Sequence, residues 1–235
     1  KIMLVVSKNM LSNPTFTIEK NILRWIRWLD FKGNKKVSSS DLSREMQNRP
    51  QKSGKFGIFF PDTIPDDNAA ILKALRAKGF LNAKIGEWNI KRSPQGYALR
   101  ITIPIEEGPQ TIVSGMTFNG NKTFTIPKLL HELKNKPGKP FDEPVLEHEK
   151  QALTTFYADN GYPYADIKQK YTIDASSQTV NIIYDIDEGP KVHIGQILII
   201  GDVMTSQKAI KNAMDIHEGD LFSYRKIIDS ELNIR

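Results

Sequence analysis

The chain has 235 residues, of which 39% are hydrophobic and 26% charged, and its formal net charge at pH 7 is +6. This apolar content suffices for folded domains, while the lack of cysteine excludes disulfides and thiolate chemistry. The apolar runs fall short of the roughly 18 residues that a membrane-spanning helix needs, and the run at residues 2–6 is too short for the core of a signal peptide.

Residues 1–22 differ in pattern from the rest of the chain. The segment KIMLVVSKN precedes LSNP and TFTIEKN, which suits two short strands with a connection between them. We interpret residues 1–22 as a remnant of a preceding unit, which would make the chain an interior fragment, or as an unstructured leader.

From residue 23 onward the sequence repeats itself, and internal repeats decide the fold before any single residue does. Residues 106–154 align without a gap on residues 187–235 at an offset of 81, and Phe118–Asn121 aligns on Phe31–Asn34 at an offset of 87. The glycines that recur are Gly33, Gly79, Gly108, Gly120, Gly161, Gly189 and Gly201. The repetition predicts unit A at 23–108, unit B at 109–190 and a truncated unit C at 191–235.

Unit B shows the internal order most clearly. A strand over residues 112–118 ends at Gly120-Asn121, residues that tolerate positive φ and so make a tight turn, as Gly33-Asn34 does in unit A. A helix begins near Thr125, and a second begins near Glu143 and stops at Asn160-Gly161. Two strands close the unit. The order β-α-α-β-β predicts an α+β fold, with two helices on one face of a three-stranded mixed sheet.

Unit A departs from this pattern between its helices. Gly33 and Gly79 are 46 residues apart, whereas Gly120 and Gly161 are 41 apart, so unit A has five extra residues. The extra stretch holds three aromatic residues where polar ones are expected, namely Phe56, Phe59 and Phe60. They either cap the core of unit A or form an exposed apolar knob for a partner.

The ordered recurrence of these features resembles POTRA domains, the polypeptide-transport-associated repeats of BamA-like outer-membrane assembly proteins. The matching residues are Phe118, Gly120, Asn121, Leu129, Leu133, Gly138, Phe141, Leu153, Tyr157, Gly161, Tyr162, Glu188 and Gly189. The resemblance implies a periplasmic array that docks accessory lipoproteins and guides nascent outer-membrane proteins to a membrane barrel in the same full-length chain. A TamA-like factor or a two-partner secretion transporter is a close variant, although more than two units speaks against the latter. Since the family's signal sequence and barrel are not in this sequence, we expect a soluble excerpt.

The resemblance places the second strand of each unit, predicted over residues 83–91 in unit A and 165–172 in unit B, at the edge of its sheet. In unit B, charged and apolar residues alternate along this strand, which is how exposed edges avoid uncontrolled pairing. An exposed edge can bind an extended peptide through main-chain hydrogen bonds. The predicted peptide-binding residues are Ala165, Asp166, Ile167, Lys168, Gln169, Lys170 and Tyr171 in unit B and Ala83, Lys84 and Ile85 in unit A.

A second hypothesis comes from charge. Unit A holds 16 Lys and Arg against 9 Asp and Glu, whereas unit B holds 8 against 11. Unit A could therefore bind nucleic acid or an anionic surface, with Trp25 and Trp28 nearby. We favour a solvated basic face, with both tryptophans packed under the first strand or its lead-in, over nucleic acid as a partner.

The sequence offers no support for catalysis. The four histidines lie in separate predicted elements without metal-ligand spacing, and no phosphate-binding or nucleophile motif is found. The pairs Asp66-Asp67 and Glu106-Glu107 fit a helix start and a strand end. We therefore predict a protein that is not an enzyme and needs no cofactor or metal.

Overall fold

The computed structural model describes residues 3–6, 16–19, 24–51, 57–94, 98–200 and 206–234. The chain divides into two compact units, here called unit 1 (Lys1–Leu75 and Asn82–Gly108) and unit 2 (Arg76–Leu81 and Pro109–Arg235). In the described part of the chain, no helix is long and apolar enough to cross a membrane. Near the N-terminus, β1 (Met3–Val6) pairs antiparallel with β2 (Phe16–Glu19). Whether this pair closes a preceding unit stays a prediction.

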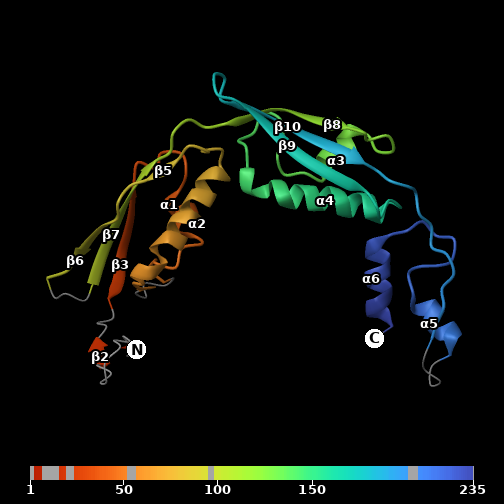
Figure 1. Cartoon of the computed structure of the whole chain (residues 1–235), viewed down its shortest axis with the longest axis horizontal. Coiled ribbons are helices and arrows are strands. Elements are labelled where there is room, and N and C mark those ends of the chain that lie inside the picture. The colour runs from red at the N-terminus through yellow and green to blue at the C-terminus, as the bar shows by residue number, and fades with distance from the viewer. Residues whose placement is uncertain are drawn as a thin grey trace, which may run out of the picture. The chain divides into compact units, whose positions relative to one another are not determined.

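Unit 2 contains the predicted β-α-α-β-β module. Its elements are β8 (Ile112–Asn119), α3 (Ile126–His131), the 3-10 turn η3 (Glu143–Val145), α4 (Leu146–Asp159), β9 (Asp166–Asp174) and β10 (Thr179–Asp187), followed by α5 (Gln207–Ala213) and α6 (Tyr224–Asn233). The sheet order is β8-β10-β9, with β10 parallel to β8 and antiparallel to β9. Both α3 and α4 lie on one face of this sheet (Figure 1). The predicted fold class is confirmed, and alternate residues of β10 are buried beneath the helices.

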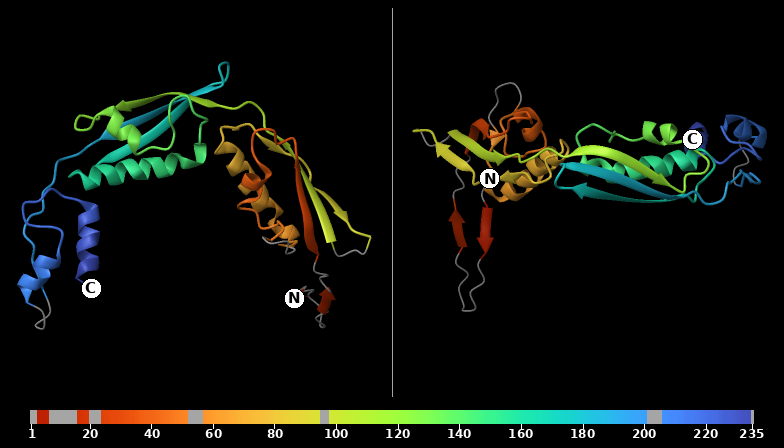
Figure 2. Two further views of the ribbon diagram at one scale, coloured as in Figure 1. Left: turned by 180° about the vertical axis from the view of Figure 1, so that it is seen from behind. Right: turned by 90° about the horizontal axis from the view of Figure 1, so that it is seen from above.

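Unit 1 builds the same module with additions. Its elements after β2 are β3 (Trp25–Lys32), α1 (Ser39–Ser43), β4 (Gly57–Ile58), η2 (Pro61–Thr63), α2 (Ile64–Arg76), β5 (Lys84–Ile85), β6 (Asn89–Arg92) and β7 (Ala98–Glu106). The helices again cover one face of the sheet (Figure 2). This sheet has five strands rather than the predicted three, because β4 is added beside β3 and the second strand is divided into β5 and β6.

The corner after the first strand has the same geometry in both units. Gly33 has φ of +97° and Gly120 has φ of +83°, and a Cβ on either would lie 2.1 Å from a carbonyl oxygen of the last strand. The side chains of Asn34 and Asn121 each donate to the carbonyl three residues on, at 2.9 and 3.1 Å. The predicted turns are confirmed, and Gly201 lies outside the described residues.

A glutamate at the end of the last strand fixes this corner. In unit 2, Glu188 accepts hydrogen bonds from the backbone N–H of Lys122 and of Thr123, both at 2.9 Å, and from the hydroxyl of Thr123 at 2.7 Å. In unit 1, Glu107 accepts from the backbone N–H of Lys36 and Val37 at 2.9 and 3.0 Å. The predicted acidic strand end is thus a latch that ties the last strand to the loop before the first helix.

Buried amides hold the connection between the two helices. The side chain of Asn135 accepts from the N–H of Asp142 and donates to its carbonyl, at 2.8 and 3.1 Å. Asn48 makes the same pair of bonds with Phe60, at 2.7 and 2.9 Å. These two asparagines were not singled out from the sequence.

Buried carboxylates on the second helix complete this connection. Asp67 accepts from the N–H of Gln47 and Asn48, and Glu149 accepts from the N–H of Lys134 and Asn135. Asp67, predicted only as part of a helix start, therefore also anchors the preceding loop.

In each repeat, one further glycine follows the end of the second helix. Gly79 and Gly161 have φ of +85° and +94°, and their carbonyls accept the N–H of Thr111 and Val192, both at 2.8 Å. Gly108 and Gly189, which follow the latch glutamates, also have positive φ. Phe80 is buried, whereas Tyr162 is only partly buried and accepts a hydrogen bond from the Thr123 hydroxyl at 3.0 Å.

Candidate partner-binding edges

The second strand of unit 2 lies at the edge of its sheet, as predicted. β9 pairs over its nine residues with β10 and has no strand on its other side among the described residues. In an antiparallel pair, alternate residues direct both N–H and C=O away from the partner strand. β9 therefore offers a row of backbone donors and acceptors that another strand could use.

Side chains divide β9 into two faces. Toward the helices, Ala165 and Ile167 are buried, and the Tyr171 hydroxyl donates to Glu143 at 2.8 Å. This hydrogen bond, followed by partial burial, raises the pKa of Tyr171. Gln169, on the same face, donates to Glu147 at 3.3 Å. Thus Ile167, Gln169 and Tyr171 of the edge strand all contact unit 2 itself, whereas Ile173 near its end is exposed.

The outer face of β9 is charged. Lys168 lies 3.7 Å from Asp166, and Lys170 donates to Asp185 of β10 at 2.7 Å. Hydrogen bonds from Asn119 and then Lys170 lower the pKa of Asp185. These exposed charges limit indiscriminate pairing while leaving the backbone accessible. Of the predicted edge residues of unit 2, residues 166–171 lie on β9 and Ala165 directly precedes it.

The corresponding edge in unit 1 is interrupted. Ala83 precedes β5, which contains only Lys84 and Ile85, and β6 begins at Asn89. Between them Trp88 donates through its Nε1 to the side chain of Asn68 in α2 at 2.9 Å. The prediction of one strand over residues 83–91 is wrong, because Trp88 fixes the intervening residues to α2.

Comparison with known proteins decides the family. The model of the POTRA family, described as surface antigen variable number repeat, matches residues 26–108 and 111–189. The chain belongs to the POTRA family.

Relatives of these POTRA repeats are outer-membrane assembly factors. BamA of Nitratidesulfovibrio vulgaris (strain Hildenborough) is 23% identical over 220 residues, covering 89% of this chain and 27% of that protein. BamA of Neisseria meningitidis serogroup B is 21% identical over 207 residues, covering 84% of this chain and 26% of that protein. The chain thus spans about a quarter of the length of these relatives. The crystal structure of Haemophilus influenzae BamA POTRA3-5 superposes with a TM-score of 0.55 at 19% identity, covering 90% of this chain and 85% of that one, which supports the fold.

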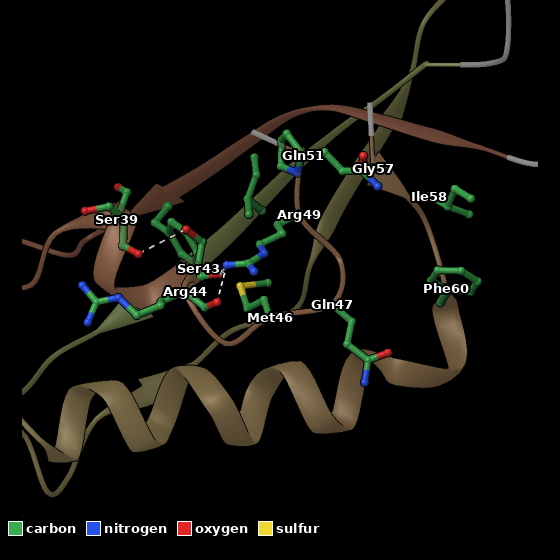
Figure 3. A pocket seen from close by; sticks show the side chains of 14 residues that line it. Ser39, Ser43, Arg44, Met46, Gln47, Arg49, Gln51, Gly57, Ile58 and Phe60 are labelled. Carbon is green, nitrogen blue, oxygen red and sulfur yellow. Dashed lines mark hydrogen bonds between the residues drawn. The ribbon is translucent and has the colours of Figure 1, made fainter. Parts of the chain in front are cut away.

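The first POTRA unit also has a groove beside its added strand. It has a volume of about 980 Å³ and lies between α1, β3 and β4 (Figure 3). Its apolar lining includes Leu29, Phe31, Met46, Ile58 and Phe60. Arg49 borders it and donates to the carbonyl of Ser43 at 2.9 Å and to that of Arg44.

The structure describes two of the three aromatic residues in the insertion of this POTRA unit. Phe59 is partly buried and its N–H bonds to the carbonyl of Arg24 at 2.9 Å, whereas Phe60 is 48% exposed. Phe56 lies outside the described residues. Whether these aromatics serve the core or a partner therefore stays a prediction, and Phe60 has the exposure that a partner contact requires.

Trp25 and Trp28 do not pack under the first strand. They are 37% and 39% exposed, and both point to the sheet face opposite the helices, since they align with Ala98 and Arg100 of β7. The prediction is wrong because the register between β3 and β7 shifts between Ile26 and Trp28. Strict alternation would have placed Trp25 and Trp28 on opposite faces.

In the described part of the POTRA units, no group of three or more His, Cys, Asp or Glu side chains could hold a metal ion. The carboxylates of Glu107, Glu149 and Glu188 are engaged by backbone N–H groups.

Proposed function

We propose that these POTRA repeats act in outer-membrane protein assembly, as a non-enzymatic periplasmic scaffold of an outer-membrane protein. Membership of the family and the similarity to BamA proteins support this role. In this proposal the array binds accessory proteins and nascent outer-membrane proteins by strand addition.

The observation that carries the proposal is the free side of β9. Among the described residues, its nine residues pair with β10 only, and Ile167, Gln169 and Tyr171 on its core-facing side already contact unit 2. An added strand would therefore be bound mainly through its main chain, so its side chains would be loosely specified. Such tolerance suits clients whose strands alternate apolar and polar residues in many different sequences.

In this proposal, the sheet edge of unit 2 binds an added strand more tightly than the edge of unit 1. The edge of unit 1 offers two residues in β5 and four in β6. Since each added main-chain hydrogen bond contributes only about 1 kcal/mol, a shorter or broken register weakens binding. We expect accessory contacts in unit 1 to use side chains instead, with Phe60 and the groove beside it as the contact surface.

Proline substitution tests the edge. Lys168 and Gln169 are neighbours, so one of them directs its N–H toward β10 and the other toward the free side. Lys168→Pro and Gln169→Pro should therefore have different effects. The proline that removes the N–H facing β10 should destabilise unit 2. The proline that removes the N–H on the free side should leave the free energy of unfolding little changed but abolish binding of a ten-residue alternating Val-Thr peptide, measured by fluorescence anisotropy. Ile182→Pro in the central strand should unfold unit 2.

Two results would overturn the assignment. One is peptide binding that survives both prolines in β9 while unit 2 stays folded. The other is a bound peptide whose contacts, mapped by NMR shift changes, lie only on the helices. The Lys168→Ala variant serves as the control, because it removes the same side chain and keeps the backbone donor.

A further inference from the structure

The first strand of each unit has an irregularity at the same place. In unit 1 the register of β3 on β7 shifts between Ile26 and Trp28, and in unit 2 the register of β10 on β8 shifts between Val180 and Asn181. The repeat offset of 87 places Arg27 on Ser114 and Trp28 on Gly115. The bulge is therefore part of the shared scaffold, and what it displays can differ between units.

In unit 1 the bulge displays a tryptophan held between two cations. The guanidinium carbons of Arg27 and Arg100 lie 4.6 and 4.7 Å from the ring centroid of Trp28. Lys91 of β6 lies opposite Arg100, and the carboxylate of Asp30 lies 3.2 Å from the Arg100 guanidinium. Both arginines thus have fixed positions on the open face of the sheet, where planar guanidinium groups can bind phosphate or carboxylate oxygens in pairs.

Unit 2 shows that the scaffold does not require this cluster. The positions that correspond to Arg27, Trp28, Arg100 and Lys91 by repeat offset and strand register hold small or uncharged side chains, namely Ser114, Gly115, Asn181 and Thr172. The second unit forms the same bulge and the same sheet without them. Folding therefore does not explain why unit 1 exposes Trp25 and Trp28 among like charges.

We propose that the open sheet face of unit 1, here called the Trp28 face, binds the surface of an anionic phospholipid membrane. The face lies opposite the helices and presents two half-exposed tryptophans beside Arg27, Arg100 and Lys91. Tryptophan prefers the headgroup level of a bilayer, and cations near an anionic leaflet add to binding. Stacking on nucleic-acid bases would need the ring of Trp28, over which the guanidinium groups of Arg27 and Arg100 already lie.

The test uses the full chain and vesicles. We expect co-sedimentation with phosphatidylcholine vesicles containing about one third phosphatidylglycerol, but not with pure phosphatidylcholine. Binding should shift the tryptophan emission to shorter wavelengths and should weaken steeply with salt. Arg27→Ser with Arg100→Asn, which installs the residues of unit 2, should weaken binding about tenfold or more.

The control variant removes two cations elsewhere. Lys73→Ser with Lys128→Ser has the same net charge, and both lysines are exposed on helices. It should bind vesicles within about twofold of the parent chain. Unchanged circular dichroism and melting temperature would show that each variant is folded. The variant with Arg27 and Arg100 replaced keeps Trp28, so that the packing of this ring is not removed.

Three outcomes would overturn the proposal. The first is equal vesicle binding by the Arg27/Arg100 variant and the lysine control, since net charge alone would then explain it. The second is equal binding to neutral vesicles. The third is tighter binding to single-stranded DNA or to poly-glutamate than to anionic vesicles, each lost in the arginine variant, which would assign the face to that polyanion instead.

Discussion

In unit 2 the second strand runs unbroken over nine residues beside β10, whereas in unit 1 the same stretch is divided around Trp88. The open faces differ too, with Arg27 and Trp28 at the bulge of one unit and Ser114 and Gly115 at that of the other. The glycine corners, the latch glutamates and the buried asparagines are the same in both. The comparison separates residues that build the module from residues that give each copy its surface.

The corner glycine should give the largest effect. Gly120→Val places a branched side chain at φ of +83° with its Cβ 2.1 Å from the carbonyl oxygen of Ile186. Strain and collision together should destabilise unit 2 by about 4 kcal/mol or more. Gly138→Ala is the control, because its φ of +76° is similar but nothing lies within 4 Å of the added Cβ. Circular dichroism during urea unfolding measures both, and equal losses would contradict the role of the close approach.

The buried asparagines should rank second. Asn48→Ala and Asn135→Ala each remove the acceptor of one backbone N–H, that of Phe60 or of Asp142, and one bond to the same residue's carbonyl, so each should cost about 3 kcal/mol in its own unit. All three tryptophans, Trp25, Trp28 and Trp88, belong to unit 1, so their fluorescence reports only that unit. Asn48→Ala should shift the tryptophan transition, whereas Asn135→Ala should shift circular dichroism alone. A loss in one unit without a comparable loss in the other would show that the amides are not a shared part of the module.

Sequence reasoning found the elements that repeat with little variation. The Gly-Asn corner and the alternation in the last strand pointed to the fold, and the alternating charges of residues 166–170 pointed to the edge. The buried asparagines were missed because Asn48 and Asn135 repeat at an offset of 87 while their partners Phe60 and Asp142 repeat at 82. The five-residue difference lies between them, so no single alignment shows both.

The parts that depend on short or irregular backbone could not be predicted. A two-residue strand such as β4 has no periodicity to detect, and it forms because Trp25 and Ile26 offer a partner. The positions of Trp25 and Trp28 were predicted wrongly for a related reason. A bulge reverses alternation after one residue, and nothing in the sequence around Arg27 marks it.

The latch glutamate should have a smaller, pH-dependent effect. Burial alone would raise the pKa of Glu188, but the hydrogen bonds donated by Thr123 and Lys122 outweigh it, so its pKa lies below the ordinary 4.5. A depressed pKa means that the carboxylate stabilises the fold above its unfolded pKa, and that this stabilisation is lost as the pH falls through the folded pKa. Glu188→Gln should cost about 1.5 kcal/mol at pH 7.

Chemical unfolding of the parent and the Glu188→Gln variant from pH 7 downward measures the difference. The two curves should converge once the pH has fallen below the folded pKa of Glu188, where the carboxyl is protonated in both states. A difference that stays constant down to that pH would show that Gln disturbs packing and that the charge is not the source. Glu107→Gln, monitored by tryptophan fluorescence, tests whether unit 1 uses the same latch.

The smallest effect on stability should come from Phe60. Its backbone makes the same two bonds with Asn48 that Asp142 makes with Asn135, so the two residues occupy equivalent positions. Unit 2 folds with a carboxylate there, and the Phe60 side chain is 48% exposed. Phe60→Asp should therefore lower the stability of unit 1 by less than about 1 kcal/mol. If the ring serves a partner, the variant should weaken binding of accessory proteins, measured by surface plasmon resonance, whereas Phe59→Ala should mainly lower the tryptophan-detected stability. A large stability loss from Phe60→Asp with unchanged binding would instead make Phe60 part of the core, as the alternative interpretation of the insertion predicts.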